Sequence, residues 1–507
     1  MEADTSTSVA PFELDEVTLA ELQQSMESGE RTARSITELY LERIEALNQE
    51  GPELRAIIET NPDALAIADA LDTERRATGP RGPLHGIPIA LKDNIDTGDR
   101  MQTTAGSLAL LGSPAPTDAH VAERLRAAGA VLIAKANLSE WANFRSTRSS
   151  SGWSARGGQC RNPYILDRSP CGSSSGSGVA VAANLSAAAV GTETDGSVVC
   201  PAAINGIVGI KPTLGLVSRA GIVPIAHSQD TAGPMARTVA DAAALLSVMI
   251  GSDPRDPVTA DAAGRSIDLH AILMPGSLKG ARLGLARDMM GFHDKVDGLM
   301  EEAVAALRDA GAEVVDFELG LARKTIDDAE LLVLAYEMKA DMAVYLATRP
   351  DIPHRSMADL IAFNEANRDT EMPWFGQELF ELCQKKGSLE TPEYLEALAT
   401  SKRLTRAEGI DKALVAHGIE AIMAPTASPA WTIDLVVGDH FIGGSSTPAA
   451  VAGYPHITVP CGFVQQLPVG LSFFGARWSD GRMIALAHGY EQATGHRRPP
   501  SFVETLR

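Results

Sequence analysis

The chain has 507 residues, of which 45% are hydrophobic and 21% are charged. This composition is typical of a globular protein, and the length is sufficient to bury a large core. The 44 basic and 65 acidic residues give a formal net charge of −21, and because an acidic surface repels phosphate groups, we expect no binding to nucleic acid.

The N-terminal segment, MEADTSTSVAPFELDEVTLAEL, is polar and acidic. It lacks the basic start and the apolar run of a signal peptide, although the mature form of a secreted protein would look the same, so the compartment stays open. The longest mostly apolar stretch, residues 179–190, is interrupted by Asn184 and Ser186 and falls short of the ~20 residues that a membrane span needs. We therefore expect a soluble protein with no membrane-spanning segment in this chain.

Five cysteines are scattered along the chain: Cys160, Cys171, Cys200, Cys383 and Cys461. No C-x-x-C pair occurs, so the sequence predicts no zinc site. Cys160 and Cys171 could form a disulfide in an oxidising compartment, but ordinary free thiols are the preferred expectation.

Helices are predicted for residues 18–26 and 32–47, where apolar residues recur at three- and four-residue spacing and Thr18 and Thr32 are candidate N-caps. From residue 81 onward, strand-like and helix-like runs alternate. PLHGIPIALKDNID predicts a buried strand, and VAERLRAAGAVLIAKAN predicts a helix, a glycine turn and a strand. This alternation is typical of an α/β fold.

Residues 144–178 form a long stretch rich in Ser, Gly and Arg, which leads into a buried-looking helix, VAVAANLSAAA. Loops of this length inside a compact domain are usually functional or disordered, and we favour a functional one. Residues 251–420 are predicted to be mainly helical. The short apolar runs AIMAP, HITVPCGF and VGLSFFGAR then predict strands that rejoin the first sheet.

Two segments rich in serine and glycine stand out, CGSSSGSG at 171–178 and GTETDGSVVCPA at 191–202. A phosphate-binding loop is disfavoured because no Gly-Lys-Ser/Thr ends the first segment. Gly172 to Gly176 could instead be a G-x-S-x-G nucleophile elbow in which Ser174 attacks. That interpretation requires a later acid and a histidine, and most of the later histidines are isolated in helical or terminal polar contexts: His417, His488 and His496.

A third interpretation joins both segments to the strand-like IPIALK, so that Ser173 and Ser197, which are 24 positions apart, act with the upstream Lys92. Each of these residues has an ordinary explanation when taken alone. A lysine at the end of a strand usually reaches water or pairs with a carboxylate, here Asp93 or Asp96, and Ser173 could cap a helix. Only the joint spacing of the three residues points to catalysis.

This combination resembles the amidase signature family, which the chain matches at the two serine segments and at a lysine element, GIPIALKDN (86–94) followed by TTAGS (103–107). Further similar segments are GIKPT (209–213), SQDTAGPMAR (228–237), GYPHITVP (453–460) and LPVGLSF (467–473). The resemblance implies an α/β fold, a single compact domain with a central mixed β-sheet covered by helices on both faces. We expect one domain over residues 1–507, with a helical N-terminal arm (1–80), a catalytic core (81–250), a helical insertion on the substrate side (251–420), and closing strands and a helix (421–507).

The resemblance also implies a role for each matching residue. Ser197 matches the nucleophile, Lys92 matches the general base, and Ser173 matches the bridging serine, held through a cis peptide bond to the next residue. The oxyanion hole is implied to be formed by four backbone N–H groups, those of Thr194, Asp195, Gly196 and Ser197. No metal ion and no organic cofactor is implied.

The chemistry explains these residue types. A serine hydroxyl is a poor nucleophile until a base removes its proton. A solvated lysine has a pKa of ~10.4 and is charged at neutral pH, but burial disfavours the ammonium form and lowers that pKa. Lys92 ends an apolar strand, which is the right setting, and Ser173 could relay the proton between Lys92 and Ser197 and later return it to the leaving amine.

The chain departs from the usual family pattern, GTDxGGSIRxP, at three positions. Glu193 replaces the usual Asp, Asp195 the usual Gly, and Val199 the usual Arg. These departures argue against the ordinary glutaminyl-tRNA amidotransferase subunit. The TETDGS form resembles the bacterial peptide amidases, which remove the amide from peptide C-termini and leave internal peptide bonds intact.

We therefore expect a monomeric amidase whose partner is a peptide or small-molecule amide. The alternatives are a broad-specificity amidase for small or aryl amides and an ammonia-delivering subunit of an amidotransferase. A peptide substrate needs an elongated groove, for which residues 144–178 and about 280–420 are candidate walls. Four tryptophans could pack substrate side chains there or belong to the core: Trp141, Trp153, Trp374 and Trp431.

Overall fold

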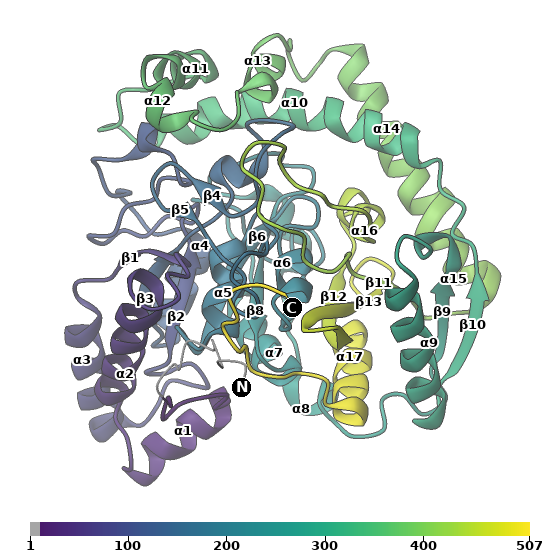
Figure 1. The fold of residues 1–507 in the computed structure, drawn as a ribbon, viewed down its shortest axis with the longest axis horizontal. Coiled ribbons are helices and arrows are strands. Elements are labelled where there is room, and N and C mark those ends of the chain that lie inside the picture. The colour runs from purple at the N-terminus through teal and green to yellow at the C-terminus, as the bar shows by residue number, and fades with distance from the viewer. Residues whose placement is uncertain (1–10, 507) are drawn as a thin grey trace, which may run out of the picture.

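The strand-like runs of the sequence come together in one sheet of eleven strands, with the order β1-β3-β2-β6-β8-β7-β12-β13-β11-β9-β10 (Figure 1). This computed structural model describes residues 11–506, so the first ten residues of the N-terminal segment discussed above lie outside it. Strands β2, β3 and β6 run parallel, as do β9, β10 and β11, and the remaining pairs are antiparallel. Helices cover both faces, which confirms the predicted mixed α/β architecture.

The strands of the main sheet are β1 (Ile57–Thr60), β2 (Pro88–Lys92), β3 (Val131–Ala136), β6 (Ala188–Glu193), β7 (Val208–Lys211), β8 (Thr231–Ala236), β9 (Arg282–Ala286), β10 (Glu313–Phe317), β11 (Ala421–Pro425), β12 (His456–Val464) and β13 (Leu467–Phe474). A separate two-stranded sheet contains β4 (Trp153–Ser154) and β5 (Gly158–Gln159).

The α-helices are α1 (Leu19–Ser28), α2 (Ala33–Ile44), α3 (Ala64–Thr78), α4 (His120–Ala127), α5 (Ser175–Ala182), α6 (Val199–Ile204), α7 (Val239–Met249), α8 (Leu269–Ile272), α9 (Asp294–Asp309), α10 (Arg323–Ala347), α11 (Met357–Ala366), α12 (Arg368–Glu371), α13 (Glu378–Gln384), α14 (Pro392–Thr405), α15 (Asp411–His417), α16 (Thr447–Ala452) and α17 (Asp480–Thr494). No helix within residues 11–506 has the length and apolarity needed to cross a membrane.

Many of the predicted elements form where the sequence places them. Thr18 and Thr32 are the N-caps of α1 and α2, and each closes a capping box with the residue three positions on. The run IPIALK forms β2, and the three apolar runs after residue 420 form β11, β12 and β13, which do rejoin the first sheet.

Three strands lie where helices were predicted. Strand β1 lies inside the N-terminal arm, and β9 and β10 lie inside residues 251–420 and extend the sheet in parallel beyond β11. In β10 only Val314 and Phe317 are buried, whereas β9 is buried along most of its length. Strands of four or five residues give only a weak periodic pattern in the sequence, which is difficult to recognise between charged, helix-forming segments.

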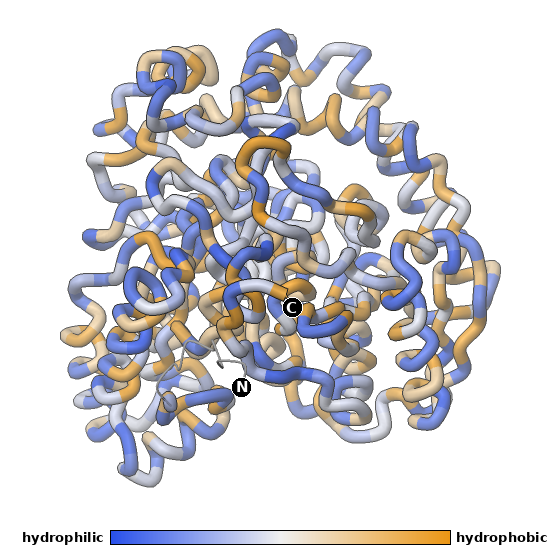
Figure 2. Tube along the Cα trace, in the orientation of Figure 1, coloured by the Kyte–Doolittle hydropathy of each residue, from blue (hydrophilic) through white to orange (hydrophobic). Residues whose placement is uncertain are grey.

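The core lies along the middle of the sheet, where β2, β3 and β6 are buried at every residue. Helix α5 packs there as well, and all eight of its residues are buried. Figure 2 shows apolar residues concentrated in these central elements, while the outer helices α10 to α14 alternate between hydrophilic and hydrophobic residues. Because a parallel sheet covered on both faces requires near-continuous apolar strands, the run IPIALK suits its central place.

The parallel pairing of β2 and β6 brings the carboxyl ends of both strands to one edge of the sheet. Lys92 ends β2, and Glu193 ends β6. Polar side chains from two distant parts of the sequence therefore meet at that edge, as is usual for sites in α/β proteins.

The cysteines differ from the sequence expectation. Cys171 and Cys200 form a disulfide, so the expectation of free thiols is wrong for these two residues. Cys160, the alternative partner of Cys171, is a buried free thiol, as are Cys383 and Cys461. The sequence separation of Cys160 and Cys171 suggested a pair, but it is the fold that brings the start of α6 against the loop before α5.

The disulfide closes a loop with a sequence separation of 29, which lowers the entropy of the unfolded chain by an amount worth about 3–4 kcal/mol in the chain-entropy model. We expect a strong reductant to lower the thermal unfolding midpoint of the wild-type protein. The Cys171→Ala/Cys200→Ala variant should have the lower midpoint from the start and should not respond to the reductant. Scanning calorimetry measures both effects, and an equal response of the two proteins to the reductant would contradict the assignment.

Candidate active site

Lys92 is fully buried at the end of β2 and hydrogen bonds only with neutral groups. Its Nζ lies 2.7 Å from Ser173 Oγ, 2.9 Å from Thr192 Oγ1 and 3.1 Å from the carbonyl oxygen of Thr192. Burial lowers the pKa of Lys92 to about 7, against the opposing effect of the more distant Asp230 and Glu193 carboxylates. A substantial fraction of this amine is therefore neutral at physiological pH.

The two aspartates next to Lys92 in the sequence do not neutralise it. Asp93 forms an ion pair with Arg156 at 3.3 Å, and Asp96 forms one with Arg349 at 3.4 Å. The ordinary interpretation of Lys92, a strand-end lysine paired with a nearby carboxylate, therefore does not hold.

Ser173 and Ser174 lie between the long irregular segment and α5, and both are fully buried. The cis peptide bond in this segment precedes Ser173 and joins it to Gly172, whereas the sequence prediction placed it after Ser173. The Ser174 hydroxyl donates to the Thr192 carbonyl oxygen at 3.1 Å and accepts from the Thr192 N–H at 3.2 Å.

The elbow interpretation loses its support in this geometry. The hydroxyl of Ser174 is held by the backbone of β6, and no histidine within residues 11–506 forms a hydrogen bond with it. Two of the later histidines, His417 and His488, lie on α15 and α17, outside this site.

Ser197 follows β6 in a tight turn that leads into α6 and is 8% exposed. Its carbonyl oxygen accepts from the Ser174 N–H at 3.1 Å, so the turn and the segment with Ser173 are directly joined. Within the described residues 11–506, the Ser197 hydroxyl has no hydrogen bond with Ser173 or with any other side chain. The structure thus brings Lys92 and Ser173 into contact and leaves the Ser197 hydroxyl unpaired.

Glu193 fixes the far side of this turn. Its Oε2 accepts hydrogen bonds from the backbone N–H groups of Val198 at 2.7 Å and Val199 at 3.0 Å. Burial raises the pKa of Glu193, while Lys211 and the two N–H groups oppose the rise. The carboxylate that replaces the usual Asp therefore caps the start of α6, directly after Ser197.

Four backbone N–H groups remain free in the same turn. Within residues 11–506, no acceptor is found for the N–H groups of Thr194, Asp195, Gly196 and Ser197. Gly196 has φ +78°, a conformation that an L side chain rarely adopts, and a Cβ there would lie 3.0 Å from Ser446 Oγ. Unpaired N–H groups in a turn of this kind form a concave binding site for an anion.

Asp195 occupies the position where the family usually has Gly, yet its φ is not positive, so the substitution does not strain the backbone. Its Oδ2 accepts a 2.6 Å hydrogen bond from Thr447 Oγ1, at the start of α16. Burial raises the pKa of Asp195, while the Ser446 and Thr447 hydroxyls and Arg323 oppose the rise. The side chain therefore ties the turn to α16.

A cavity of about 380 Å³ opens beside this turn. It is lined from the long irregular segment by Asn143, Ser146, Thr147, Arg148, Ser149, Ser151, Cys171 and Gly172, from the turn and α6 by Asp195, Gly196 and Cys200, from α10 by Arg323, and from residues 426–447 by Thr426, Trp431, Val437, Asp439, Phe441, Gly444, Ser446 and Thr447. Both candidate walls of the sequence analysis contribute. Residues 426–447 form a further wall, which the sequence analysis had marked only at Trp431.

The tryptophans divide between the core and this cavity. Trp141 and Trp153 are buried and pack edge-on against Phe380 and Phe375, so they belong to the core. Trp431 lines the cavity, and its indole N–H donates to Asp439 at 2.9 Å. Trp374 is 47% exposed and does not line the cavity.

Several residues that shape the site were not predicted. The hydroxyl of Thr192 accepts from both Lys92 and the Asn94 amide, and Asp230 accepts from Thr194 Oγ1 at 2.6 Å. Asn94 and Asp230 lie in the matching segments GIPIALKDN and SQDTAGPMAR, so a signal was present. Burial raises the pKa of Asp230 to about 6.

Comparisons with known proteins show the family of this chain. The model of the Amidase family matches residues 35–484. A probable amidase from Arabidopsis thaliana is 41% identical over 97% of this chain and 93% of its own length, and a glutamyl-tRNA(Gln) amidotransferase subunit from Symbiobacterium thermophilum is 37% identical over 94% of this chain and 96% of its own. The crystal structure of a peptide amidase from Stenotrophomonas maltophilia superposes with a TM-score of 0.93 at 53% identity, covering 97% of this chain and 100% of that one.

The family model covers most of the chain, and the crystal structure of the peptide amidase has the same overall fold. The buried lysine, the serine beside it and the turn with free N–H groups lie inside the matched region. The chain therefore belongs to the amidase family and is a hydrolase that acts on amide bonds.

Proposed function

We propose that this amidase removes ammonia from the C-terminal carboxamide of peptides, with Ser197 as the nucleophile, Ser173 as the proton relay and Lys92 as the base. The observation that carries the catalytic assignment is the 2.7 Å contact between the fully buried Lys92 amine and Ser173, on a segment joined to the turn of Ser197. The peptide preference is supported by the 53% identity to a peptide amidase and by the TETDGS sequence of the turn.

The contacts of Lys92 orient its lone pair. A neutral lysine has two N–H bonds, which the carbonyl and hydroxyl oxygens of Thr192 can accept. The Asn94 amide also donates to the Thr192 hydroxyl at 2.9 Å and fixes that oxygen. The lone pair of the neutral amine then faces the remaining partner, the Ser173 hydroxyl, and can accept its proton.

In acylation, the proton of Ser197 passes to Ser173 and that of Ser173 passes to Lys92, while Ser197 Oγ bonds to the carboxamide carbon. The carbonyl oxygen becomes an oxyanion, which the four free N–H groups of residues 194–197 are arranged to accept, and each such donor is worth on the order of 3 kcal/mol. The proton returns through Ser173 to the amide nitrogen, the C–N bond breaks, and ammonia leaves. A water molecule then attacks the acyl ester of Ser197 by the same relay and releases the acid.

The cavity supports a substrate with an extended acyl part. It combines an apolar wall, which includes Trp431, Val437 and Phe441, with hydroxyl and carboxylate groups on its other sides. Such a mixed lining suits a peptide, whose backbone needs hydrogen-bond partners and whose side chains need apolar contacts. The protein alone is expected to be active as a monomer.

The substrate class is tested with a panel of amides. We expect ammonia release from peptide amides to exceed that from simple aliphatic and aryl amides, with the internal peptide bonds intact by mass spectrometry. Preferred turnover of simple amides would contradict the peptide assignment. A protein that is inactive alone but transfers ammonia within a complex would support the amidotransferase alternative.

The nucleophile is tested by covalent labelling with a fluorophosphonate, together with turnover of the same panel of amides. Ser197→Ala should abolish both labelling and turnover, because its hydroxyl forms the acyl ester. Ser174→Ala is the matched control, since Ser174 contacts only the backbone of β6 through its hydroxyl. Labelling lost in Ser174→Ala but retained in Ser197→Ala would restore the elbow interpretation.

The pH profile tests Lys92. Because only the neutral amine can accept a proton, kcat/KM should rise with pH through a pKa of about 7. Lys92→Ala should lower kcat/KM by roughly 10²- to 10⁴-fold, and raising the pH should not restore it. Lys324→Ala, which removes an exposed lysine of α10, is the control and should keep the wild-type profile. A wild-type profile that is flat between pH 5 and 9 would contradict the role of Lys92.

A further inference from the structure

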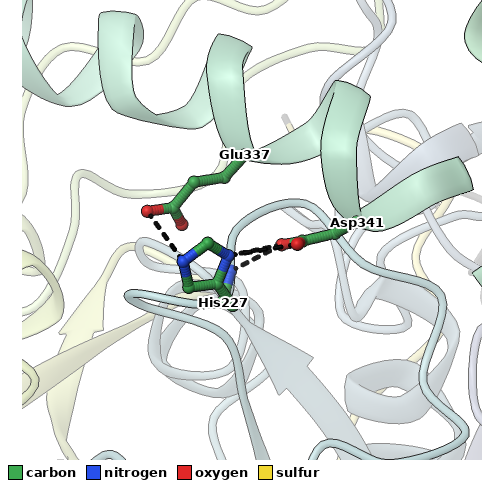
Figure 3. A group of neighbouring side chains, drawn as sticks. All are labelled: His227, Glu337 and Asp341. Atoms are coloured by element: carbon green, nitrogen blue, oxygen red, sulfur yellow. Dashed lines mark hydrogen bonds and ion pairs between the residues drawn. The ribbon is translucent and has the colours of Figure 1, made fainter. Parts of the chain in front are cut away.

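A second group of ionisable side chains consists of His227, Glu337 and Asp341 (Figure 3). His227 precedes β8, and both carboxylates that point toward its ring, Glu337 and Asp341, come from α10. The ring Nδ1 lies 2.9 Å from Asp341 Oδ2, and Nε2 lies 3.4 Å from Glu337 Oε1. The imidazole is thus held between two carboxylates of one helix.

This contact is part of a row of contacts along α10. The three carboxylates at positions 330, 337 and 341 share one helix face, because they are spaced by seven and four residues. Consecutive residues of the segment before β8 donate to them: the His227 N–H to Asp341 Oδ2 at 3.0 Å, the Ser228 N–H to Glu337 Oε2 at 2.9 Å, and Gln229 Nε2 to Glu330 Oε1 at 2.7 Å.

The same segment holds the first residue of the turn with the free N–H groups. The Thr194 hydroxyl donates to Asp230 Oδ1 at 2.6 Å, and Gln229 Nε2 also lies 3.3 Å from the Thr194 carbonyl oxygen. The other oxygen of Asp230 accepts from the N–H groups of Ile225 and Ala226 at 2.9 Å. A continuous chain of contacts therefore runs from α10 through residues 225–230 to Thr194.

We propose that His227 is a positioning residue, whose imidazolium is clamped between Asp341 and Glu337. The clamp holds residues 225–230 against α10, and these residues in turn fix the position of the oxyanion-binding turn. This inference rests on the proposed function, because it assumes that the N–H groups of residues 194–197 bind the oxyanion. A displacement of about 1 Å in such a group is enough to cost catalysis heavily, so a contact outside the site can control the rate.

The alternative use of these three residues is a metal site, since one imidazole and two carboxylates can bind a divalent cation. Each carboxylate is already occupied, however. Glu337 Oε1 accepts from the Tyr394 hydroxyl at 2.7 Å and Glu337 Oε2 accepts from Ser228, while Asp341 accepts from both the ring and the backbone of His227. A cation would have to displace these bonds, which favours the clamp.

The charges around the ring give the clamp a pH dependence. The hydrogen bond to Asp341 raises the pKa of His227, and Glu337 adds to the rise, while partial burial and Arg219 oppose it. Tyr394 of α14 reaches the ring only through Glu337. Because the folded pKa of His227 lies above its usual value, the imidazolium is complete below the usual pKa and is lost as the pH rises through the raised one.

Four variants test the clamp: His227→Ala, His227→Asn, Asp341→Asn and the control Asp328→Asn. His227→Ala and Asp341→Asn should each lower kcat about ten-fold with KM changed less than about two-fold, because the oxyanion donors shift while substrate binding persists. A fifth variant, which combines His227→Ala with Asp341→Asn, should be no worse than either single one, since the two residues act as a pair. Asp328→Asn also removes a carboxylate from α10, but from an exposed pair with Lys324, and should keep the wild-type kcat.

His227→Asn supplies a readout that a merely structural role would not move. The Asn amide can donate to Asp341 in place of Nδ1, so most of kcat should return, and the decline of wild-type activity at alkaline pH should disappear. Loss of thermal stability with an unchanged kcat would overturn the proposal, as would a change in KM alone. Inhibition of the wild type by EDTA, reversed by Zn²⁺ and absent in His227→Ala, would assign the residues to a metal instead.

Fluorophosphonate labelling of Ser197 separates this inference from the proposed function. The labelling rate depends on the geometry of the turn, whichever amide the enzyme hydrolyses. Slower labelling in His227→Ala than in Asp328→Asn, in a protein that does not hydrolyse peptide amides, would refute the substrate and support the clamp. Labelling and turnover at wild-type rates in His227→Ala and Asp341→Asn, in a protein that does hydrolyse them, would refute the clamp alone.

Discussion

The burial of the Lys92 amine without a carboxylate partner is the constraint on which the site depends. A buried ammonium would need a counter-ion, and the nearest acidic side chains in the sequence, Asp93 and Asp96, pair with arginines instead. The remaining contacts are neutral oxygens from Thr192 and Ser173, which stabilise an uncharged amine as well as a charged one. The parallel pairing of β2 and β6 supplies the two oxygens of Thr192, and burial at the end of β2 lowers the pKa of Lys92 to about 7.

The turn after β6 must meet a second requirement, which is to leave its N–H groups without acceptors and yet hold its shape. On one side, Glu193 accepts hydrogen bonds from the N–H groups of Val198 and Val199, directly after Ser197. Asp230 and Gln229 meet it from the other side through the hydroxyl and the carbonyl oxygen of Thr194. The hydrogen bonds that fix the turn therefore involve the groups before and after it and the side chain of Thr194. The N–H groups of residues 194–197 stay free to bind an anion.

Sequence alone predicted the parts of the molecule that are local or carried by motifs. The capped helices α1 and α2 and strand β2 follow from patterns within short segments, whereas the pairing of Lys92 with Ser173 was implied by the resemblance of several segments to one family. The disulfide of Cys171 with Cys200, strands β9 and β10 and the cavity wall at 426–447 depend on which segments the fold brings together, and no local pattern encodes that choice. His227 was missed for the same reason, because its two partners lie more than 100 positions away on α10.

Asp195 shows why a departure from the family pattern can leave the chemistry intact. Burial raises the pKa of Asp195, and its Oδ2 accepts a hydrogen bond from Thr447 at the start of α16, so this carboxylate oxygen is held by the fold. The positive φ that only glycine adopts readily is needed one position later, where Gly196 is kept. The substitution thus costs no backbone strain and adds a link between the turn and residues 426–447, the wall that the acyl part of a substrate would touch. Asp195 therefore connects the turn with the free N–H groups to the wall of the cavity through a single hydrogen bond with Thr447.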